Sequence, residues 1–199
     1  MTVLDTAGVA VPATRPGKPM GWWGVMLTIA TEGTIFVALL ASYYFVRSVS
    51  DEWPQGGIEA PPLTRVSIFT VVLLASSLPL FYGEHAIKRG NRRGLQIALA
   101  LSWLMGFAFM INQGIEFAEL KFGVDDNAYA SLFIVISGLH GLHVIVGLLI
   151  SIIVQIKAAR GWFDSERHVT VTVFSLYWHF VDVVWIFVFT TLHLSPHFR

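Results

Sequence analysis

Five long runs of apolar residues follow one another along the chain, separated by short segments that hold most of its charges. Each run is close to the roughly 20 residues that an α-helix needs to cross the hydrocarbon core of a bilayer. We therefore predict an all-α integral membrane protein, a bundle of five transmembrane helices within residues 22–199, preceded by an N-terminal segment of residues 1–21. The predicted spans are residues 22–46, 66–83, 95–116, 128–157 and 169–194.

The composition supports a membrane protein and excludes several other classes. Hydrophobic residues make up 55% of the chain and charged residues only 13%, too few charges for a water-exposed surface of this size. The formal net charge is zero, which argues against nucleic-acid binding. Without cysteine, the chain has no disulfide, iron–sulfur cluster or thiolate copper site. The first 20 residues contain only a short apolar run, so we expect the first helix to insert without cleavage of a signal peptide.

The distribution of basic residues predicts the orientation in the membrane. Nine of the 13 Lys and Arg residues fall on the side of the N-terminus, and the other four fall on the opposite side. The nine are Arg15, Lys18, Lys88, Arg89, Arg92, Arg93, Lys157, Arg160 and Arg167. Because the loops richer in Lys and Arg stay in the cytoplasm, we predict a cytoplasmic N-terminus and a C-terminus outside.

Ionisable residues inside the predicted spans are the candidate functional residues. With a helical rise of 1.5 Å per residue, Glu32, His140 and His179 fall at about the same depth, near the middle of the membrane. His143 lies one turn further inward, and Asp182 lies one turn further outward on the same face as His179. We predict a shared internal polar zone, because charged side chains inside a membrane persist only where they face protein, water or headgroups. The alternative is that these residues only hold neighbouring helices together.

A di-haem membrane cytochrome is the main alternative with a redox centre. It requires two helices that each carry histidines about four turns apart. His179 and His193 have this spacing on the last span, but His140 and His143 on the fourth span do not. We therefore predict that this chain binds no haem.

Two further alternatives agree less well with the residues. A carboxylate-bridged di-iron centre needs Glu-x-x-His motifs on facing helices, which Glu84, His85 and Glu116 do not supply. A small transporter or proton channel could use Glu32 and Asp182, but transporters often contain repeated halves, and these five spans are unlike one another. We predict no metal site and no catalytic residue in this chain.

Two longer segments resemble the signature of subunit III of haem-copper terminal oxidases. Residues 137–147 read Ser-Gly-Leu-His-Gly-Leu-His-Val-Ile-Val-Gly, and residues 177–185 read Tyr-Trp-His-Phe-Val-Asp-Val-Val-Trp. Shorter features precede them in the family's order: Glu32, then Gln113 and Glu116, then Tyr129, Ser131 and Phe133. The resemblance covers about residues 22–192 and is to the short, five-helix bacterial form of the family.

The resemblance implies an accessory core subunit of a respiratory oxidase, in a bacterial plasma (inner) membrane. Such a subunit carries no redox centre, holds phospholipid in a cleft, and supports proton uptake and durable turnover. Its partners would be the catalytic subunit I and subunit II, which hold the haem and copper. The residues carried over are the intramembrane polar set Glu32, His140, His143, His179 and Asp182, with Gln113, Glu116, Trp178 and Trp185 in support. Subunit III of a quinol oxidase, or an accessory protein of nitric oxide reductase, remains an alternative.

Overall fold

The computed structural model describes residues 2–4, 10–12 and 19–198, and five helical segments in it are long and apolar enough to cross a membrane. They are α1 (Met20–Val49), α2 with α3 (Leu63–Ala75 and Ser77–Lys88), α4 (Arg92–Glu119), α5 (Ala128–Ala159) and α6 (Val169–Phe189). A π-helical turn (Thr190–Leu194) and a 3-10 turn (Ser195–His197) continue α6, and another 3-10 turn (Gln55–Gly57) follows α1. Strands β1 (Thr2–Leu4) and β2 (Ala10–Pro12) form an antiparallel pair.

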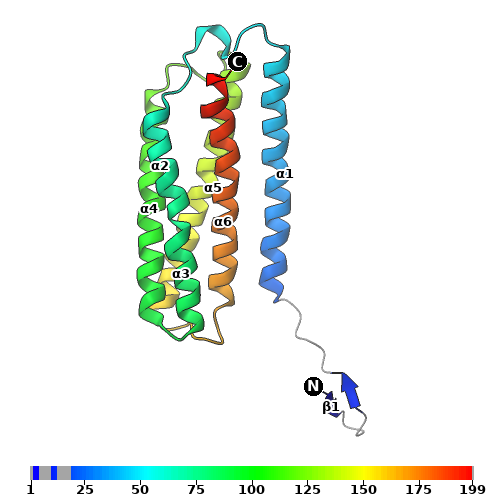
Figure 1. Ribbon diagram of the computed structural model, residues 1–199, viewed down its shortest axis with the longest axis vertical. Coiled ribbons are helices and arrows are strands. Elements are labelled where there is room, and N and C mark those ends of the chain that lie inside the picture. Colours follow the sequence, from blue (N-terminus) through cyan, green and yellow to red (C-terminus); the bar gives the residue numbers. More distant parts are fainter. Residues whose placement is uncertain (1, 5–9, 13–18, 199) are drawn as a thin grey trace.

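Helices α2–α6 form a bundle, and α1 stands beside it, next to α6 (Figure 1). The helices run alternately up and down, so α1 begins at the end where α3 stops, and the chain finishes at the opposite end (Figure 1). We call these the basic end and the C-terminal end. The described basic residues of the larger group lie at the first: Lys88, Arg89, Arg92, Arg93, Lys157, Arg160 and Arg167. Arg15 and Lys18 lie outside the described residues, as does most of the predicted N-terminal segment.

Five spans in the predicted order are confirmed, although their ends differ from the prediction by a few residues, and the second one differs most. It begins three residues earlier and ends five residues later than predicted, because the helix continues through Arg65 and Lys88, beyond the apolar run. It is also divided at Ser76, where α2 ends and α3 begins. Pro79 explains the division, since its ring crowds the carbonyl group of Ala75 and it has no N–H to donate to it.

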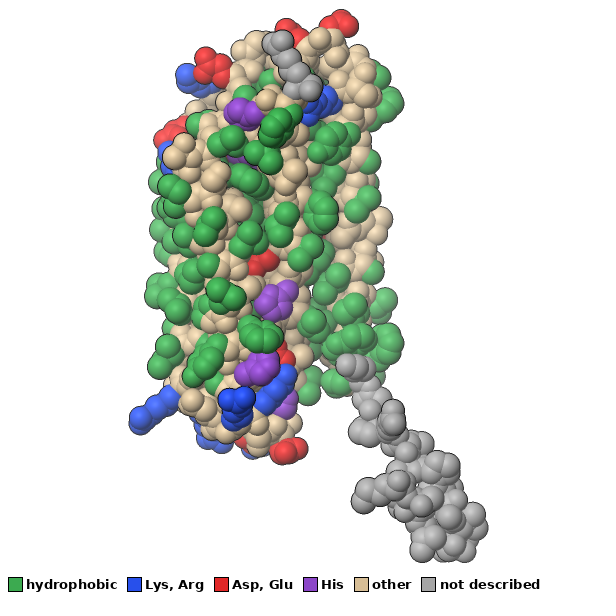
Figure 2. Space-filling view, in the orientation of Figure 1, with side chains coloured by type: hydrophobic (Ala, Val, Ile, Leu, Met, Phe, Trp, Pro, Cys, Tyr) green, Lys and Arg blue, Asp and Glu red, His purple; other side chains and the backbone are tan. Residues whose placement is uncertain are grey.

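The outer surface of the bundle matches a bilayer. Figure 2 shows hydrophobic side chains over the middle of the molecule, with Lys and Arg concentrated at its ends. Many large apolar side chains on this surface are exposed, among them Leu27, Val37, Ile97, Leu104 and Phe187. An apolar belt of this kind needs lipid or other membrane helices around it.

Trp178 is the centre of the packing between α4, α5 and α6. Its side chain is fully buried, and its indole N–H donates to Ser76 Oγ at 2.8 Å. The ring fits between two glycines, because a Cβ atom on Gly106 or on Gly147 would lie only 2.7 Å from it. These glycines therefore set how closely α4 and α5 approach α6.

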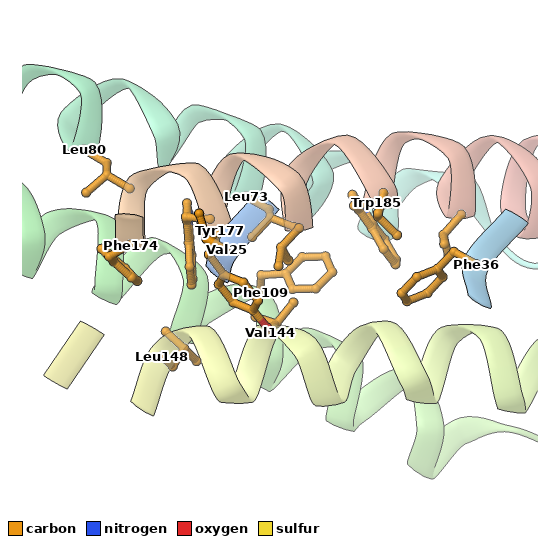
Figure 3. Close-up of a cluster of buried hydrophobic side chains, with 14 of the residues drawn as sticks. Val25, Phe36, Leu73, Leu80, Phe109, Val144, Leu148, Phe174, Tyr177 and Trp185 are labelled. Atoms are coloured by element: carbon orange, nitrogen blue, oxygen red, sulfur yellow. The ribbon is translucent and has the colours of Figure 1, made fainter. Parts of the chain in front are cut away.

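The interior next to Trp178 is also aromatic. Trp185 of α6, Phe109 of α4 and Phe36 of α1 point into the space between the helices (Figure 3). The rings of Trp185 and Phe109 meet edge to face, with centroids 4.8 Å apart, and the Trp185 indole N–H donates to Thr70 Oγ1 at 3.0 Å. Both buried tryptophans thus have a hydrogen-bond partner, as buried indoles usually do.

Candidate functional site

A cavity of about 640 Å³ lies between α1, α5 and α6, towards the basic end. We call it the α1 cavity. Most of its lining is apolar, and Glu32 and His143 contribute a carboxyl group and an imidazole. The lining residues are Gly21, Gly24, Val25, Thr28, Glu32, Leu139, Leu142, His143, Val146, Ile150, Thr170, Val173, Phe174 and Tyr177.

Glu32 and His143 form a pair in the wall of this cavity. The Nε2 atom of His143 lies 3.3 Å from the carboxyl group of Glu32, and its Nδ1 atom lies 2.8 Å from the carbonyl oxygen of Leu139. A carbonyl oxygen only accepts, so Nδ1 carries a proton and donates it there. A hydrogen bond between Nε2 and the carboxyl group then needs one more proton, on either residue. The pair therefore places a carboxyl group and an imidazole in the wall of a mostly apolar cavity.

The helices that line the α1 cavity are joined by contacts of backbone as well as side-chain groups. The Tyr177 hydroxyl group donates to the carbonyl oxygen of His143 at 3.1 Å, which joins α6 to α5 behind the pair. The ring of Phe36 meets that of His143 at 5.2 Å between centroids, which joins α1 to α5. Tyr177 lies inside the second signature segment, but no feature of the sequence indicates that its hydroxyl group reaches α5.

His179 and Asp182 do not line the α1 cavity. They lie between α6 and α3, where Ser77 Oγ is 2.8 Å from His179 Nδ1 and 2.5 Å from Asp182 Oδ2. Ser77 is not among the residues predicted from the sequence, because a serine in an apolar run gives no signal of its own. In the described residues, no hydrogen bond or ion pair joins this group to Glu32 or His143.

His140 is in a third environment, separate from both groups. Its side chain is fully buried, and neither ring nitrogen has a hydrogen-bond partner among the described residues. The ring packs on Trp185 with centroids 4.7 Å apart, and Phe36 and Phe109 meet it edge to face. The predicted shared polar zone is thus divided into three parts, because equal depth on three helices does not decide which way the side chains face.

The supporting residues Gln113 and Glu116 lie nearer the C-terminal end. Gln113 Nε2 donates to the carbonyl oxygen of Ser137 at 2.9 Å, joining α4 to α5. Glu116 lies 2.8 Å from Nε2 of His193, in the π-helical turn, and also lines a second cavity of about 620 Å³. Across the described part of the chain, no three His, Asp or Glu side chains are placed to hold a metal ion.

Comparison with known proteins identifies the family of this chain. The model of the family described as cytochrome c oxidase subunit III matches residues 14–195, which include every candidate residue discussed above. The chain belongs to this family. It is 35% identical over 176 residues to cytochrome c oxidase subunit 3 of Thermostichus vulcanus, an alignment that covers 88% of this chain and 87% of the relative.

Two further relatives have similar identity to this chain. The subunit 3 of a Synechocystis strain is 36% identical over 173 residues, covering 86% of this chain and 74% of that relative. The subunit 3 of Rattus norvegicus is 33% identical over 177 residues, covering 86% and 68%. The resemblance seen in the two signature segments is confirmed. The chain is a multi-pass membrane protein with the role of subunit III in a respiratory oxidoreductase complex.

Proposed function

We propose that this chain is the accessory subunit III of a bacterial cytochrome c oxidase and that it holds phospholipid in the α1 cavity. It has no redox centre of its own, and the haem and copper belong to the partner subunits I and II. Bound lipid and the surrounding helices support proton uptake and durable turnover by subunit I. The cavity beside the Glu32–His143 pair is the observation that carries the proposal.

The lining of the α1 cavity suits a lipid chain better than water. Its walls are mostly Leu, Val, Ile and Phe side chains, and polar atoms are few. The α1 helix that forms one wall is the least buried of the five spans, so the cavity borders a surface that a bilayer surrounds. Space between apolar helices at this depth is filled by hydrocarbon when no protein fills it.

The proposed placement in a bacterial inner membrane has the basic end in the cytoplasm. The described residues Lys88, Arg92 and Lys157 lie at that end, as the positive-inside rule requires. The names of the relatives favour cytochrome c over quinol as the electron donor of the complex. No observation on this chain favours the quinol oxidase, the nitric oxide reductase protein or the transporter.

A bulky side chain in the α1 cavity tests the lipid role. Gly24 lines the cavity and has no atom within 4 Å of its Cβ position, so Gly24→Phe adds a bulky side chain at a point where the first added atom meets nothing. We expect the oxidase with this change to keep its haem spectrum and initial turnover, to retain less phospholipid, and to inactivate in fewer cycles. Gly114→Phe is the matched control, since its Cβ position on α4 is also open and it does not line the cavity.

The outcomes test the lipid role of the cavity and the accessory role of the subunit separately. Unchanged phospholipid content and lifetime in Gly24→Phe would reject the lipid role of the cavity. Loss of the first turnover in a fully assembled complex would reject the accessory role. Glu32→Gln adds a third measurement: it removes the carboxyl group while keeping a side chain of the same size, and we expect weaker lipid retention with normal electron transfer.

A further inference from the structure

The second cavity, of about 620 Å³, lies at the C-terminal end, where α2 begins and α4 ends. We call it the α2–α4 cavity. Its lining comes from within residues 57–66 and 116–122, together with Phe133 of α5. Charged side chains in this lining stand next to buried apolar ones, such as Val66 and Phe133. Because the ends of membrane-spanning helices lie near the lipid headgroups, the cavity lies where headgroups meet the first part of the acyl chains.

The charged side chains of this lining do not balance among themselves. They are three carboxylates and two cations: Glu59, Glu116, Glu119, Arg65 and Lys121. Both Nη atoms of Arg65 donate to Glu119, so these two charges satisfy each other. In the part of the chain that the structure describes, neither Lys121 nor Glu59 forms an ion pair. Figure 2 shows acidic and basic side chains close together at this end of the molecule. The lining thus contains one carboxylate more than it has cations.

Glu116 is the carboxylate that the fold holds in place. Its side chain is largely buried, and its Oε1 atom accepts a hydrogen bond from Nε2 of the buried His193 at 2.8 Å. The Nδ1 atom of His193 is buried and has no partner among the described residues. A charged ring would leave an N–H group buried there without an acceptor, which costs more than an unused lone pair on a neutral ring. The geometry therefore favours a neutral His193, and Glu116 keeps a negative charge that a cation from outside this chain can balance.

The surroundings of Glu116 suit an organic ammonium group better than a metal ion. No three His, Asp or Glu side chains of the described residues are placed to hold a metal. Two aromatic rings of the lining lie beside the carboxylate instead. The centroid of Phe133 is 5.6 Å from that of His193, and the ring of Phe122 meets Phe133 edge to face at 5.7 Å. Aromatic faces attract ammonium groups, and a carboxylate accepts hydrogen bonds from a primary one.

We propose that the α2–α4 cavity binds the headgroup of an amine phospholipid, phosphatidylethanolamine, with the ammonium group on Glu116 and the phosphate on Lys121. The two free charges of opposite sign in one lining match the two charges of this headgroup. Apolar residues such as Pro61, Val66 and Leu120 offer a surface to the start of the acyl chains, which a soluble amine would not use. The position of His193 in a π-helical turn agrees with a binding role, since such turns often occur at functional sites.

This site is separate from the α1 cavity. The α1 cavity lies towards the basic end between α1, α5 and α6, and it shares no lining residue with the α2–α4 cavity. The lipid proposed here enters from the opposite leaflet and is selected by its headgroup, whereas the α1 cavity has mostly apolar walls. The inference therefore goes beyond the proposed function and does not depend on it.

The test is native mass spectrometry of the full chain in detergent, with phosphatidylethanolamine, phosphatidylcholine or phosphatidylglycerol added in turn. Wild type should bind phosphatidylethanolamine about tenfold or more tightly than the other two, because only a primary ammonium group donates hydrogen bonds to the carboxylate. Glu116→Gln should lose most of this preference, although Gln keeps an oxygen that accepts from His193 and so preserves that contact. Lys121→Ala should weaken binding about two- to fivefold, since exposed charges contribute less.

Glu52→Gln is the matched control. Glu52 is a carboxylate at the same end that accepts from the backbone N–H group of Gly56 at 2.9 Å and does not line the cavity, so this variant should bind like wild type. Gly24→Phe should also keep the lipid preference, because Gly24 lines only the α1 cavity. Loss of the preference in Glu52→Gln as well would mean that net charge, and not the cavity, selects the lipid.

Three other results would overturn the site. They are equal binding of the three lipids by wild type, an unchanged preference in Glu116→Gln, and displacement of the lipid by equally low concentrations of soluble phosphoethanolamine. If Glu116→Gln fails to fold, Lys121→Ala decides the question, because it changes an exposed side chain: wild-type affinity in that variant would reject the phosphate contact. Since different substitutions alter the two cavities, a failure here would leave the lipid role of the α1 cavity untouched.

Discussion

Helix α1 and the bundle of α2–α6 are held in place in different ways. In the most apolar part of α1 only 11% of residues are buried, against 56% in α6. Trp178 and its two glycines lock α4, α5 and α6 together by shape, whereas α1 stands beside α6 with the α1 cavity between them (Figure 1). The bundle is a packed core, and α1 is attached to it.

The attachment of α1 is concentrated at the C-terminal end. Arg47 donates from Nη1 to Ser195 Oγ at 2.8 Å and from Nη2 to the carbonyl oxygen of Phe198 at 2.5 Å. The hydroxyl group of Tyr43 lies 3.3 Å from Ser195 Oγ and accepts from Trp53 Nε1 at 2.9 Å. We call these residues the C-terminal clasp. The polar contacts between α1 and the C-terminal turns thus lie at one end of the helix, whereas the α1 cavity lies towards the other end.

The largest expected effect comes from adding one methyl group to the bundle. Gly106→Ala places a Cβ atom 2.7 Å from the buried ring of Trp178, which also lies close to Gly147. We expect a loss of about 1–3 kcal/mol in the free energy of unfolding, the usual cost of overpacking. Unfolding in mixed detergent micelles, followed by tryptophan fluorescence, measures it.

The same substitution in α1 is the control for that experiment. Gly24→Ala meets nothing within 4 Å, so we expect it to leave the free energy of unfolding within about 0.5 kcal/mol of wild type or to raise it slightly. Equal losses in Gly106→Ala and Gly24→Ala would show that α1 is packed as tightly as the bundle, contrary to the comparison.

A smaller effect is expected from opening the C-terminal clasp. Arg47→Ala removes two hydrogen bonds from a charged donor, and we expect a loss of about 1–2 kcal/mol. Because the chain has no native cysteine, spin labels on single introduced cysteines in α1 and α6 report their separation at the C-terminal end. The distribution of distances should broaden in the variant.

Arg65→Ala is the matched control for the clasp. Arg65 also donates to a partner on another helix, but its ion pair with Glu119 joins α2 to α4 and is largely exposed. Exposed pairs contribute about 0.2–1 kcal/mol, so the α1–α6 distances should stay as in wild type. Broadening in Arg65→Ala as well would mean that α1 responds to general destabilisation and that the clasp has no special role.

The spans were predictable from sequence because each needs only a long apolar run. The site was predictable only in part. Glu32 and His143 were both candidates, and the structure pairs them. His140 and His179 were placed at the same depth as Glu32, but the structure turns them towards different neighbours.

The sequence does not show how each helix is rotated about its own axis within the bundle. Depth follows from counting residues, whereas the direction of a side chain depends on which helix packs beside it and on breaks such as that at Ser76. Ser77 follows that break directly and contacts both His179 and Asp182. A serine that connects two candidate residues cannot be recognised until the helices are arranged.

The smallest expected effect concerns the loop between α5 and α6, at the basic end. The Asp164 carboxylate accepts hydrogen bonds from the Arg167 side chain at 2.6 and 2.9 Å and from the backbone N–H groups of Arg167 and Glu166. The side-chain bond to Arg167 is the main reason that the pKa of Asp164 is lowered from 3.8 to about 2. With a lowered folded-state pKa, the contribution of this carboxylate is complete above pH 3.8 and is lost as the pH falls towards 2.

Arg167→Ala should therefore return the pKa of Asp164 towards 3.8, as measured by NMR titration of its side-chain carboxyl carbon. The loop is exposed, so we expect no measurable change in unfolding at neutral pH, in contrast to the tightly packed glycines of the same bundle. Lys157→Ala is the control, because Lys157 lies near the same loop over the ring of Trp162 and has no bond to Asp164. An unchanged pKa in Arg167→Ala would mean that the backbone N–H groups alone hold the carboxylate ionised, and the loop would then be ordered by its turn geometry and not by its charges.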